Sequence, residues 1–229
     1  SLQWSAIRHE RHHFTNKTTK TIHFSVDTAL YSQLFYAIYL DADGNFWTAS
    51  VHDASNPKKT KSGCLVKYHY PSGKTTVYPA GKGISFASSI VLDITCDAKG
   101  NVYLLNKFGV CQLNPGSGKT SVYYSNELLP DNTYVSMELD AKNRLWLGTL
   151  TNGIVVYDIP TNKYILLKGQ PTLLSNDMLM QASTQDDNNH LYFWDVTGIN
   201  IFNANDIQFN LPQPKAIVSD ILIRGKSII

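Results

Sequence analysis

The segment at residues 9–13 carries the residue types of a zinc hydrolase. It reads His-Glu-Arg-His-His and satisfies H-E-x-x-H, in which two histidines hold zinc and the glutamate polarises the bound water. The two histidines come close enough to hold one metal only on a helix, because residues i and i+4 of a strand lie about 13 Å apart, and residues 7–14 show no helical apolar stripe. We therefore expect a solvated polar strand here, with weak adventitious metal binding as the alternative. No metal site and no cofactor is predicted.

A second segment, Gly-Ser-Gly-Lys-Thr at residues 116–120, contains part of a phosphate-binding loop. The full motif needs glycine at position 113, which is Leu113, and a helix after the loop. The same turn recurs as Ser-Gly-Lys-Thr at 72–75 and Thr-Asn-Lys at 161–163. A hairpin repeated along the chain explains it better than a nucleotide site.

Carboxylates are the third candidate for chemistry, because glycosidases need two of them about 5–9 Å apart. Asp93, Glu138 and Asp195 could face a central channel, but their spacing does not pair them. Four others recur at regular turns, where a short acid accepts backbone N–H bonds. These four are Asp41, Asp97, Asp140 and Asp186.

The composition favours strands over charged surface helices. Of 229 residues, 43% are hydrophobic and 11% aromatic, while only 17% are charged, below the roughly 25% of an average domain. A net charge of +2 argues against a phosphate-binding surface, so no nucleic-acid partner is expected. Three cysteines, Cys64, Cys96 and Cys111, are too few for a disulfide framework and are interpreted as small buried hydrophobes.

A repeat organises the chain. The unit Asp-Ala-Asp-Gly-Asn-Phe-Trp at residues 41–47 is echoed at 97–103, 140–146 and 186–192. Its fourth place holds Gly or Asn, which tolerate positive φ, and its seventh place holds Trp or Tyr. Strands are expected before and after each turn, followed by a third strand opened by Gly and a fourth begun by Lys.

Four short antiparallel strands per unit of about 40–50 residues predict an all-β fold, the β-propeller, with one unit per blade. Residues 14–24 fit the outer half of a first blade, and three full blades and an incomplete last one follow. We expect these four to five blades to belong to a seven-bladed parent. The repeated aromatics are expected to form the core between blades.

Three segments of the third full unit resemble a known family. They are residues 128–140, 144–149 (Arg-Leu-Trp-Leu-Gly-Thr) and 152–158 (Asn-Gly-Ile-Val-Val-Tyr-Asp). Together they are similar to the two-component regulator propeller repeat, and residues 174–178 match its start again. The resemblance implies the periplasmic sensor region of a bacterial hybrid two-component regulator, of the type that senses glycan breakdown products in gut Bacteroidetes. It implies propeller blades over residues 1–211. Residues 212–229 would be a linker and the first strand of a β-sandwich.

Ligand residues are expected in the loops that enter the first strand or join the second strand to the third. These loops carry aromatic, Asn, Asp and His side chains, which combine flat apolar faces with oriented hydrogen bonds, as carbohydrate recognition requires. Ordinary loop residues are the alternative. The candidates are His52, Phe86, Asn106, Phe108, Asn132, Tyr134, Thr151, Asn176, Trp194 and Asp195.

The predicted function is a non-enzymatic extracytoplasmic ligand-sensing module of a hybrid two-component sensor kinase, responding to oligosaccharides. The expected location is the periplasm, tethered to the inner membrane through the parent, with any targeting signal outside this chain. Expected partners are an oligosaccharide, neighbouring blades and the β-sandwich of the same parent, and a second parent chain in a homodimer. The alternatives are a structural or interaction propeller segment that leaves the ligand elsewhere, and a propeller-type polysaccharide lyase or hydrolase, which rests on fold analogy alone.

Overall fold

The structure, a computed structural model, describes residues 35–50, 63–79, 90–106, 109–124, 128–130, 133–169 and 171–209, and two short strands near the C-terminus. The histidine-rich segment at 9–13 and the half blade at 14–24 lie outside the described residues. So do four ligand candidates, His52, Phe86, Phe108 and Asn132.

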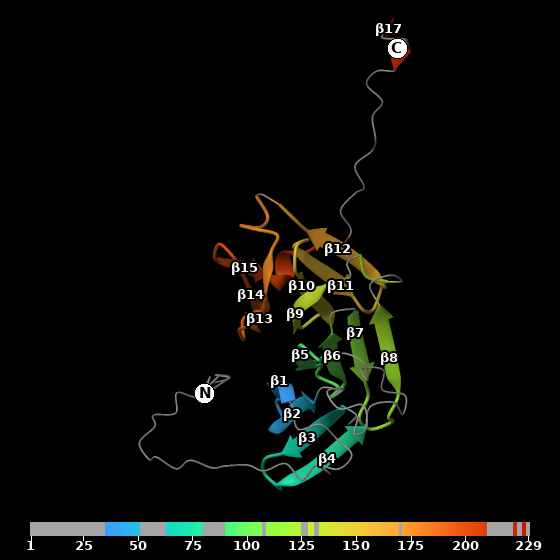
Figure 1. The fold of residues 1–229 in the computed structure, drawn as a ribbon, viewed down its shortest axis with the longest axis vertical. Helices are drawn as coiled ribbons and strands as arrows, with labels where there is room; N and C mark the ends of the chain where they lie inside the picture. The colour runs from blue at the N-terminus through green and yellow to red at the C-terminus, as the bar shows by residue number, and fades with distance from the viewer. Residues whose placement is uncertain are drawn as a thin grey trace, which may run out of the picture.

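Residues 35–209, where described, form four antiparallel sheets, which we call blades 1 to 4 (Figure 1). Blade 1 contains β1 (Phe35–Leu40), β2 (Asn45–Ser50), β3 (Cys64–His69) and β4 (Lys74–Pro79). Blade 2 contains β5 (Asp93–Cys96), β6 (Val102–Asn106), β7 (Gly109–Leu113) and β8 (Thr120–Tyr124). Blade 3 contains β9 (Tyr134–Leu139), β10 (Arg144–Thr149), β11 (Ile154–Asp158) and β12 (Lys163–Leu167). Blade 4 contains β13 (Met178–Gln185), β14 (His190–Asp195) and β15 (Ile199–Asn203).

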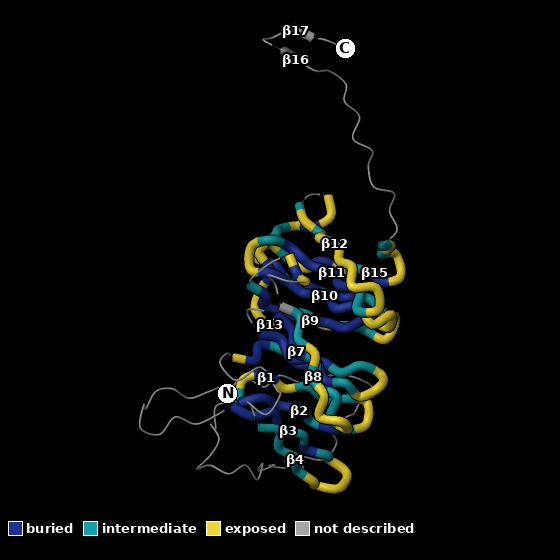
Figure 2. The backbone as a smooth tube through the Cα atoms, turned by 90° about the vertical axis from the view of Figure 1, so that its right-hand side faces the viewer, coloured by how far each residue is buried: buried dark blue, intermediate teal, exposed yellow. Residues whose placement is uncertain are grey.

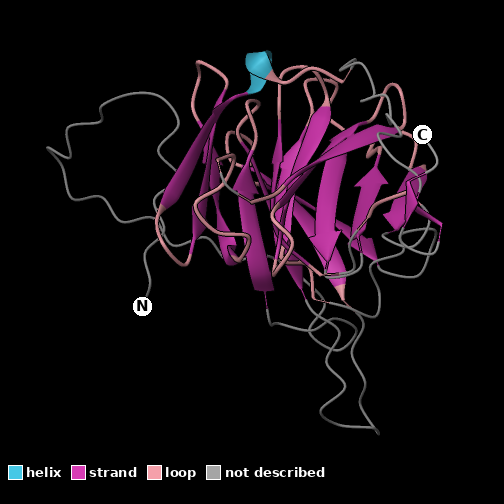
Figure 3. Cartoon of the chain, turned by 90° about the horizontal axis from the view of Figure 1, so that it is seen from above, coloured by secondary structure: helices cyan, strands magenta, loops and turns pink. Residues whose placement is uncertain are grey.

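Within every blade the strands pair in sequence order, so each is an up-and-down sheet. The first strands of the four blades lie side by side at the centre and the blades fan outward from them (Figure 1). Strands make up nearly all regular structure of the described part (Figure 3), whose helix is the single 3-10 turn Ala204–Asp206. The predicted all-β propeller with four-stranded blades is confirmed. A further strand pair, β16 (Leu222–Ile223) with β17 (Lys226–Ser227), follows near the C-terminus.

The turns follow the repeat. Gly44 and Gly100 have φ of 76° and 78°, and Asn143 and Asn189 take the same left-handed conformation at 59° and 63°. Asn tolerates this region better than other residues with a Cβ. This is why Asn replaces Gly in the last two turns without changing the hairpin.

Three apolar clusters hold the blades together, one at each junction between consecutive blades. In each cluster the repeated aromatic of one blade faces the next blade along the chain. We call that side of a blade its forward face. Buried residues follow the strands of the blades, and exposed residues gather at the turns between them (Figure 2). Trp47, Tyr103 and Trp146 are exposed by no more than 2%, which confirms their predicted place in the core. The fourth, Tyr192, is half-buried, because the described residues provide no blade beyond blade 4.

The burial of the cysteines agrees with their interpretation as small hydrophobic residues of the core for two of the three. Cys64 and Cys111 are buried, Cys96 is half-buried, and all three are free thiols. No helix in the described ranges is long and apolar enough to cross a membrane.

Candidate ligand-binding face

The strands of each blade end at two opposite rims. We call the rim with the hairpins between first and second strands the turn end. The other rim, with the loops between second and third strands and those entering each first strand, is the loop end. The repeated aspartates lie at the turn end, and the described ligand candidates belong to the loop end.

At the turn end one carboxylate oxygen of each repeated aspartate closes the hairpin. Asp140 Oδ1 accepts the backbone N–H of Lys142 at 2.9 Å and of Arg144 at 3.1 Å. The same two bonds recur at Asp41, Asp97 and Asp186. Their predicted role as turn formers is confirmed.

The second carboxylate oxygen binds the repeated aromatic six residues later. Trp47 Nε1 donates to Asp41 Oδ2 at 2.8 Å and Trp146 Nε1 donates to Asp140 Oδ2 at 2.9 Å. Tyr hydroxyls make the corresponding bonds in blades 2 and 4, at 3.3 and 3.1 Å. Sequence reasoning missed this couple, although its signal is present: the seventh place holds only aromatics with a polar donor, never Phe. With both oxygens engaged, these acids are poorly placed for catalysis.

These bonds also lower carboxyl pKa values. Burial alone would raise the pKa of Asp41, but the hydrogen bonds from Trp47 and Asn45 outweigh it and lower that pKa. Burial opposes the shift at Asp186 as well. There the bonds from His190 and Tyr192 lower the pKa to about 2. Both acids are ionised at neutral pH.

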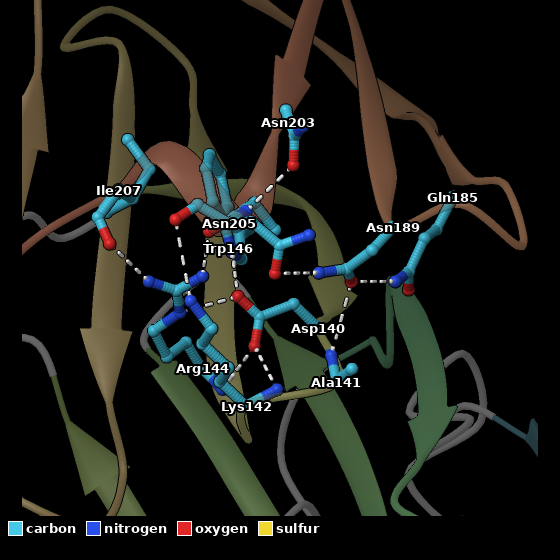
Figure 4. A network of polar contacts seen from close by, with 11 residues as sticks. Asp140, Ala141, Lys142, Arg144, Trp146, Gln185, Asn189, Asn203, Asn205 and Ile207 are labelled. Carbon is cyan, nitrogen blue, oxygen red and sulfur yellow. Dashed lines mark hydrogen bonds and ion pairs between the residues drawn. The ribbon is translucent and has the colours of Figure 1, made fainter.

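The residue after the positive-φ position adds another donor to each aspartate, and in blade 3 it does more. Arg144 Nε lies 2.6 Å from Asp140 Oδ2 in a buried ion pair. Its terminal nitrogens donate to the carbonyls of Ala204 and Ile207, the latter at 3.0 Å (Figure 4). The guanidinium also lies 6.0 Å from the ring centre of Phe209. Arg144 thereby holds the chain that leaves blade 4 against blade 3, and we call this set the exit clamp.

A small cavity of about 190 Å³ also lies at the turn end, between Cys96 and Asp97 of blade 2, Asn143 of blade 3 and Gln185 of blade 4. It is smaller than the roughly 300 Å³ at which small-molecule pockets begin. The carboxylates that border it are already engaged. The loop end is therefore the better candidate for ligand binding.

At the loop end a buried polar residue ends the second strand of every blade. Asp195 is the most connected of these: its carboxylate accepts bonds from Ser175, Thr197, Gly198 and Asn200 at 2.7–2.9 Å. Burial opposes ionisation, but these hydrogen bonds lower the pKa of Asp195 to about 2. The four strand-end residues are Ser50, Asn106, Thr149 and Asp195, each exposed by 5% or less.

Asn106 and Asp195 were predicted as ligand residues because their residue types do not recur from blade to blade. Their structural position, at the end of the second strand, does recur in every blade. Asp195 closes its loop from the end of the strand, as Thr149 does through its bonds to Asn152 and Gly153. Sequence reasoning missed this place because four different residue types occupy it. The structure gives Asp195 a structural role, and ligand contact by either residue stays a prediction.

Asn176 ties the loops of blades 3 and 4 into one unit. Its backbone carbonyl accepts the N–H of Gly153 at 2.8 Å, and its side-chain oxygen accepts that of Gly169 at 2.8 Å. Beside it, Leu174 N–H donates to Asn200 Oδ1 at 3.0 Å and Ser175 N–H to Asp195 Oδ2 at 2.9 Å. The segment that enters blade 4 is thus held from both sides.

The remaining described candidates differ in access. Tyr134 is fully buried in the core between blades 2 and 3, so its ring is not presented to solvent. Trp194 is half-buried on the forward face of blade 4, two places after Tyr192. Thr151 is exposed, as are four other residues of the tied loops. We call this set the loop-end surface: Leu150, Thr151, Leu174, Val196 and Thr197.

The first half of blade 3 matches a known repeat family. Residues 128–151, which include the Asp140–Trp146 couple and the strand-end Thr149, match the family described as two component regulator propeller. The chain carries a two-component regulator propeller repeat. This confirms the resemblance seen in the sequence, and the geometry above shows what the repeat's Asp, Trp and Thr do.

The chain is similar in sequence or fold to parts of several known proteins. A histidine kinase, P4, of Formosa agariphila is 28% identical over 97 residues, which cover 42% of this chain and 7% of that protein. Two solved structures are described as extracellular domains of hybrid two component systems of B. thetaiotaomicron. The first is 19% identical with a TM-score of 0.65, covering 93% of this chain and 29% of that one. The second is 15% identical with a TM-score of 0.51, covering 76% and 21%. The chain thus shares the fold of the two solved structures, and it spans less than a third of the length of each of these three proteins.

Proposed function

We propose that this chain is a non-enzymatic, extracytoplasmic ligand-sensing module of a hybrid two-component sensor kinase. The observation that carries the proposal is the two-component regulator propeller repeat at residues 128–151. The similarity to a histidine kinase supports a kinase in the parent. By the same reasoning the module lies in the periplasm, tethered to the inner membrane through the parent.

The ligand class we propose is an oligosaccharide released by glycan breakdown, bound at the loop-end surface. Leu150, Leu174 and Val196 are 48–63% exposed there, and Thr151 and Thr197, which carry hydroxyls, are exposed on the same loops. Apolar contact beside a few oriented hydrogen bonds suits a sugar. The backbone below is held by Asn176 and Asp195, so binding costs little ordering of the loops.

Signalling would follow from the shared network. A ligand that contacts both the Thr151 loop and the Val196 loop would act on the hydrogen bonds of Asn176 and Asp195. Together these two residues join the loops of blades 3 and 4. A ligand shifts a conformational equilibrium only by its differential affinity for the two states. The proposed states differ in how neighbouring propellers or dimer partners pack, and a distal kinase would read that difference.

The test is a thermal-shift screen of the 229-residue chain against a panel of oligosaccharides, followed by calorimetric titration of the best one. At one hundred times Kd a ligand should stabilise the fold by about 2.7 kcal/mol. A double variant, Thr151→Ala with Leu174→Ala, should weaken binding at least tenfold. Tyr164→Ala, at an exposed site on the outer strand β12, should leave binding unchanged. If no sugar stabilises the chain, the result favours the alternative of a structural propeller segment. If the sugars are shortened during incubation with the chain, the protein is an enzyme.

A further inference from the structure

The first strand of each blade is irregular at the same place, close to the loop end. In β1 the pairing with β2 skips Tyr36, and in β9 the pairing with β10 skips Val135. In blade 2, Leu92 and Asp93 both lie opposite Leu105, because Leu92 N–H also donates to the Leu105 carbonyl, at 2.7 Å. Blades 1 to 3 therefore each carry a β-bulge here, and a bulged residue stands outside the regular ladder of its sheet.

The bulge of blade 4 is larger and strained. Four residues of β13, 179–182, lie opposite the single residue Trp194 of β14. Among them Gln181 has φ of 54°, in the left-handed region that is unfavourable for a residue with a Cβ. Such a residue persists only where its surroundings hold it in place.

The side chain of Gln181 provides that hold by reaching across the inside of the arc. Its Nε2 donates to the carbonyl of Leu92 at 2.7 Å and lies 3.5 Å from the carbonyl of Tyr36. Both acceptors belong to bulged residues, one in blade 2 and one in blade 1. They converge on one amide nitrogen at the centre of the arc, where the four first strands lie side by side (Figure 1).

This contact lies at the same rim as the loop-end surface. The bulge follows directly on Met178, the residue with which β13 begins at the loop end. In the described part of the chain Gln181 is exposed, and Leu179 and Met180 beside it are exposed by 40% and 53%. A solute at the loop end therefore meets apolar side chains next to the amide of Gln181 and the carbonyls that it binds.

We propose that Gln181 is a latch over an acceptor subsite of the ligand-binding face. Its amide binds the carbonyls of Leu92 and Tyr36 in the free protein, and a hydroxyl of the ligand displaces it. Sugar hydroxyls donate hydrogen bonds as the amide does. Once displaced, Gln181 no longer ties β13 to blade 2, and the strained bulge can relax. This inference deepens the proposed function and rests on it.

The latch makes a prediction about affinity that is opposite in sign to that of an ordinary contact residue. A protein that must open before it binds has a lower apparent affinity, in proportion to the fraction that is open. Removing the amide should therefore tighten binding, whereas removing a group that contacts the ligand would weaken it. The sign of the change separates the two roles.

Calorimetry of the 229-residue chain with maltohexaose, cellohexaose and xylohexaose tests this. Gln181→Ala should bind about fivefold more tightly than the wild type, because one hydrogen bond no longer has to be broken first. Gln181→Gly should show the same gain, since it also lacks the amide but tolerates positive φ. Gln185→Ala is the matched control. Gln185 lies on the same strand, but its amide donates to Asn189 at the turn end, so the affinity should not change.

A second test needs no ligand. Amide hydrogen exchange over residues 178–182 should be faster in Gln181→Ala than in the wild type, because the bond to Leu92 no longer holds the bulge. Gln185→Ala should leave exchange there unchanged. Circular dichroism and Tm establish that the variants fold, and Gln181→Gly provides the affinity measurement if the alanine variant does not fold.

The outcomes distinguish the latch from the proposed function. If a sugar binds and its affinity depends on Thr151 and Leu174 but not on Gln181, the latch is wrong and the proposed function stands. Weaker binding by Gln181→Ala, or unchanged exchange over residues 178–182, would also overturn the latch. If neither the wild type nor Gln181→Ala binds any of the three sugars, the latch and the proposed function are both wrong.

Discussion

At the scale of residues, the Asp–aromatic couple of the turn end appears four times in different surroundings. Asp140 and Trp146 are buried, whereas Asp186 and Tyr192 of blade 4 are partly exposed. Water can replace a lost partner only at the exposed couple, so the same bond should contribute different amounts to stability. The couple thus offers an internal comparison of one hydrogen bond at two depths.

We expect Trp146→Ala to lower the free energy of unfolding by about 3–5 kcal/mol, as for other large buried aromatics. Trp146→Phe keeps most of the ring but leaves a buried oxygen of Asp140 with one donor fewer, and should cost about 1–3 kcal/mol. Tyr192→Phe should change stability by less than about 1 kcal/mol. Urea unfolding of the three variants checks this. A loss below about 1 kcal/mol for Trp146→Ala would place that ring at an exposed site.

Asp93 provides a pH-dependent test. Its carboxylate accepts the N–H of Met137 at 3.0 Å and of Ile94 at 2.9 Å, yet burial raises its pKa to about 7. The folded state therefore holds a proton that the unfolded state releases near pH 4. Stability contributed by this group is full below pH 4 and is lost as the pH rises towards 7. Asp93→Asn should flatten the stability profile between pH 4 and 7, measured by chemical unfolding at several pH values. An unchanged slope would contradict it.

At the scale of elements, the exit clamp joins a turn of blade 3 to the segment that follows blade 4. In blades 1 and 2 the place of Arg144 holds Asn45 and Asn101, which also donate to their aspartates. Only the arginine reaches further, to the carbonyls of Ala204 and Ile207. The longer side chain of Arg144 therefore occurs in the blade whose turn also binds the segment that follows blade 4.

Arg144→Asn should therefore release the exit segment while keeping the turn. A donor to Asp140 remains, but the bonds to residues 204 and 207 and the contact with Phe209 are lost. We expect faster amide exchange over residues 204–209 and a loss of about 3 kcal/mol in stability, the scale for breaking a buried pair. Asn101→Ala in blade 2 is the control and should leave exchange at 204–209 unchanged. Hydrogen exchange with mass spectrometry makes the comparison, and protection retained in Arg144→Asn would show that the clamp does not hold the segment.

The sequence predicted those elements whose cause is local. The hairpins followed from Gly44, Gly100, Asn143 and Asn189, whose positive φ is a property of one residue. The core aromatics followed from their register. The strand-end place was missed, because Ser, Asn, Thr and Asp serve the same purpose through different atoms. The partners of Arg144 were missed too, since they lie about 60 residues away along the chain and no short pattern reports such a distance.

At the scale of the whole molecule, one side chain ties blade 4 to blades near the start of the chain. Gln181 lies in a bulge of β13 with φ of 54°. Its Nε2 donates to the carbonyl of Leu92 at 2.7 Å and lies 3.5 Å from that of Tyr36. The shorter bond links blade 4 to blade 2, and the same nitrogen lies near blade 1. Gln181 therefore helps to hold the arc of blades together.

Gln181→Ala should lower stability by about 1 kcal/mol through loss of these bonds. Gln181→Gly loses the same bonds but relieves the left-handed backbone, so it should be more stable than the alanine variant by about 1 kcal/mol. Thermal unfolding of the two variants separates the two effects. Equal stability of the alanine and glycine variants would show that the bulge carries no strain, and an unchanged alanine variant would show that the bond contributes nothing.

The seven residues from Asp140 to Trp146 contain much of what their own hairpin needs: the carboxylate, the left-handed residue, the extra donor and the aromatic. A stretch of gene that encodes one such blade can therefore be copied in tandem and still fold its turn at once, without compensating changes elsewhere. What each new copy must acquire is a forward face that suits its neighbour. Lengthening a propeller of this kind is then a matter of duplication first and adjustment of a few apolar side chains afterwards, while the loops of each copy are free to diverge.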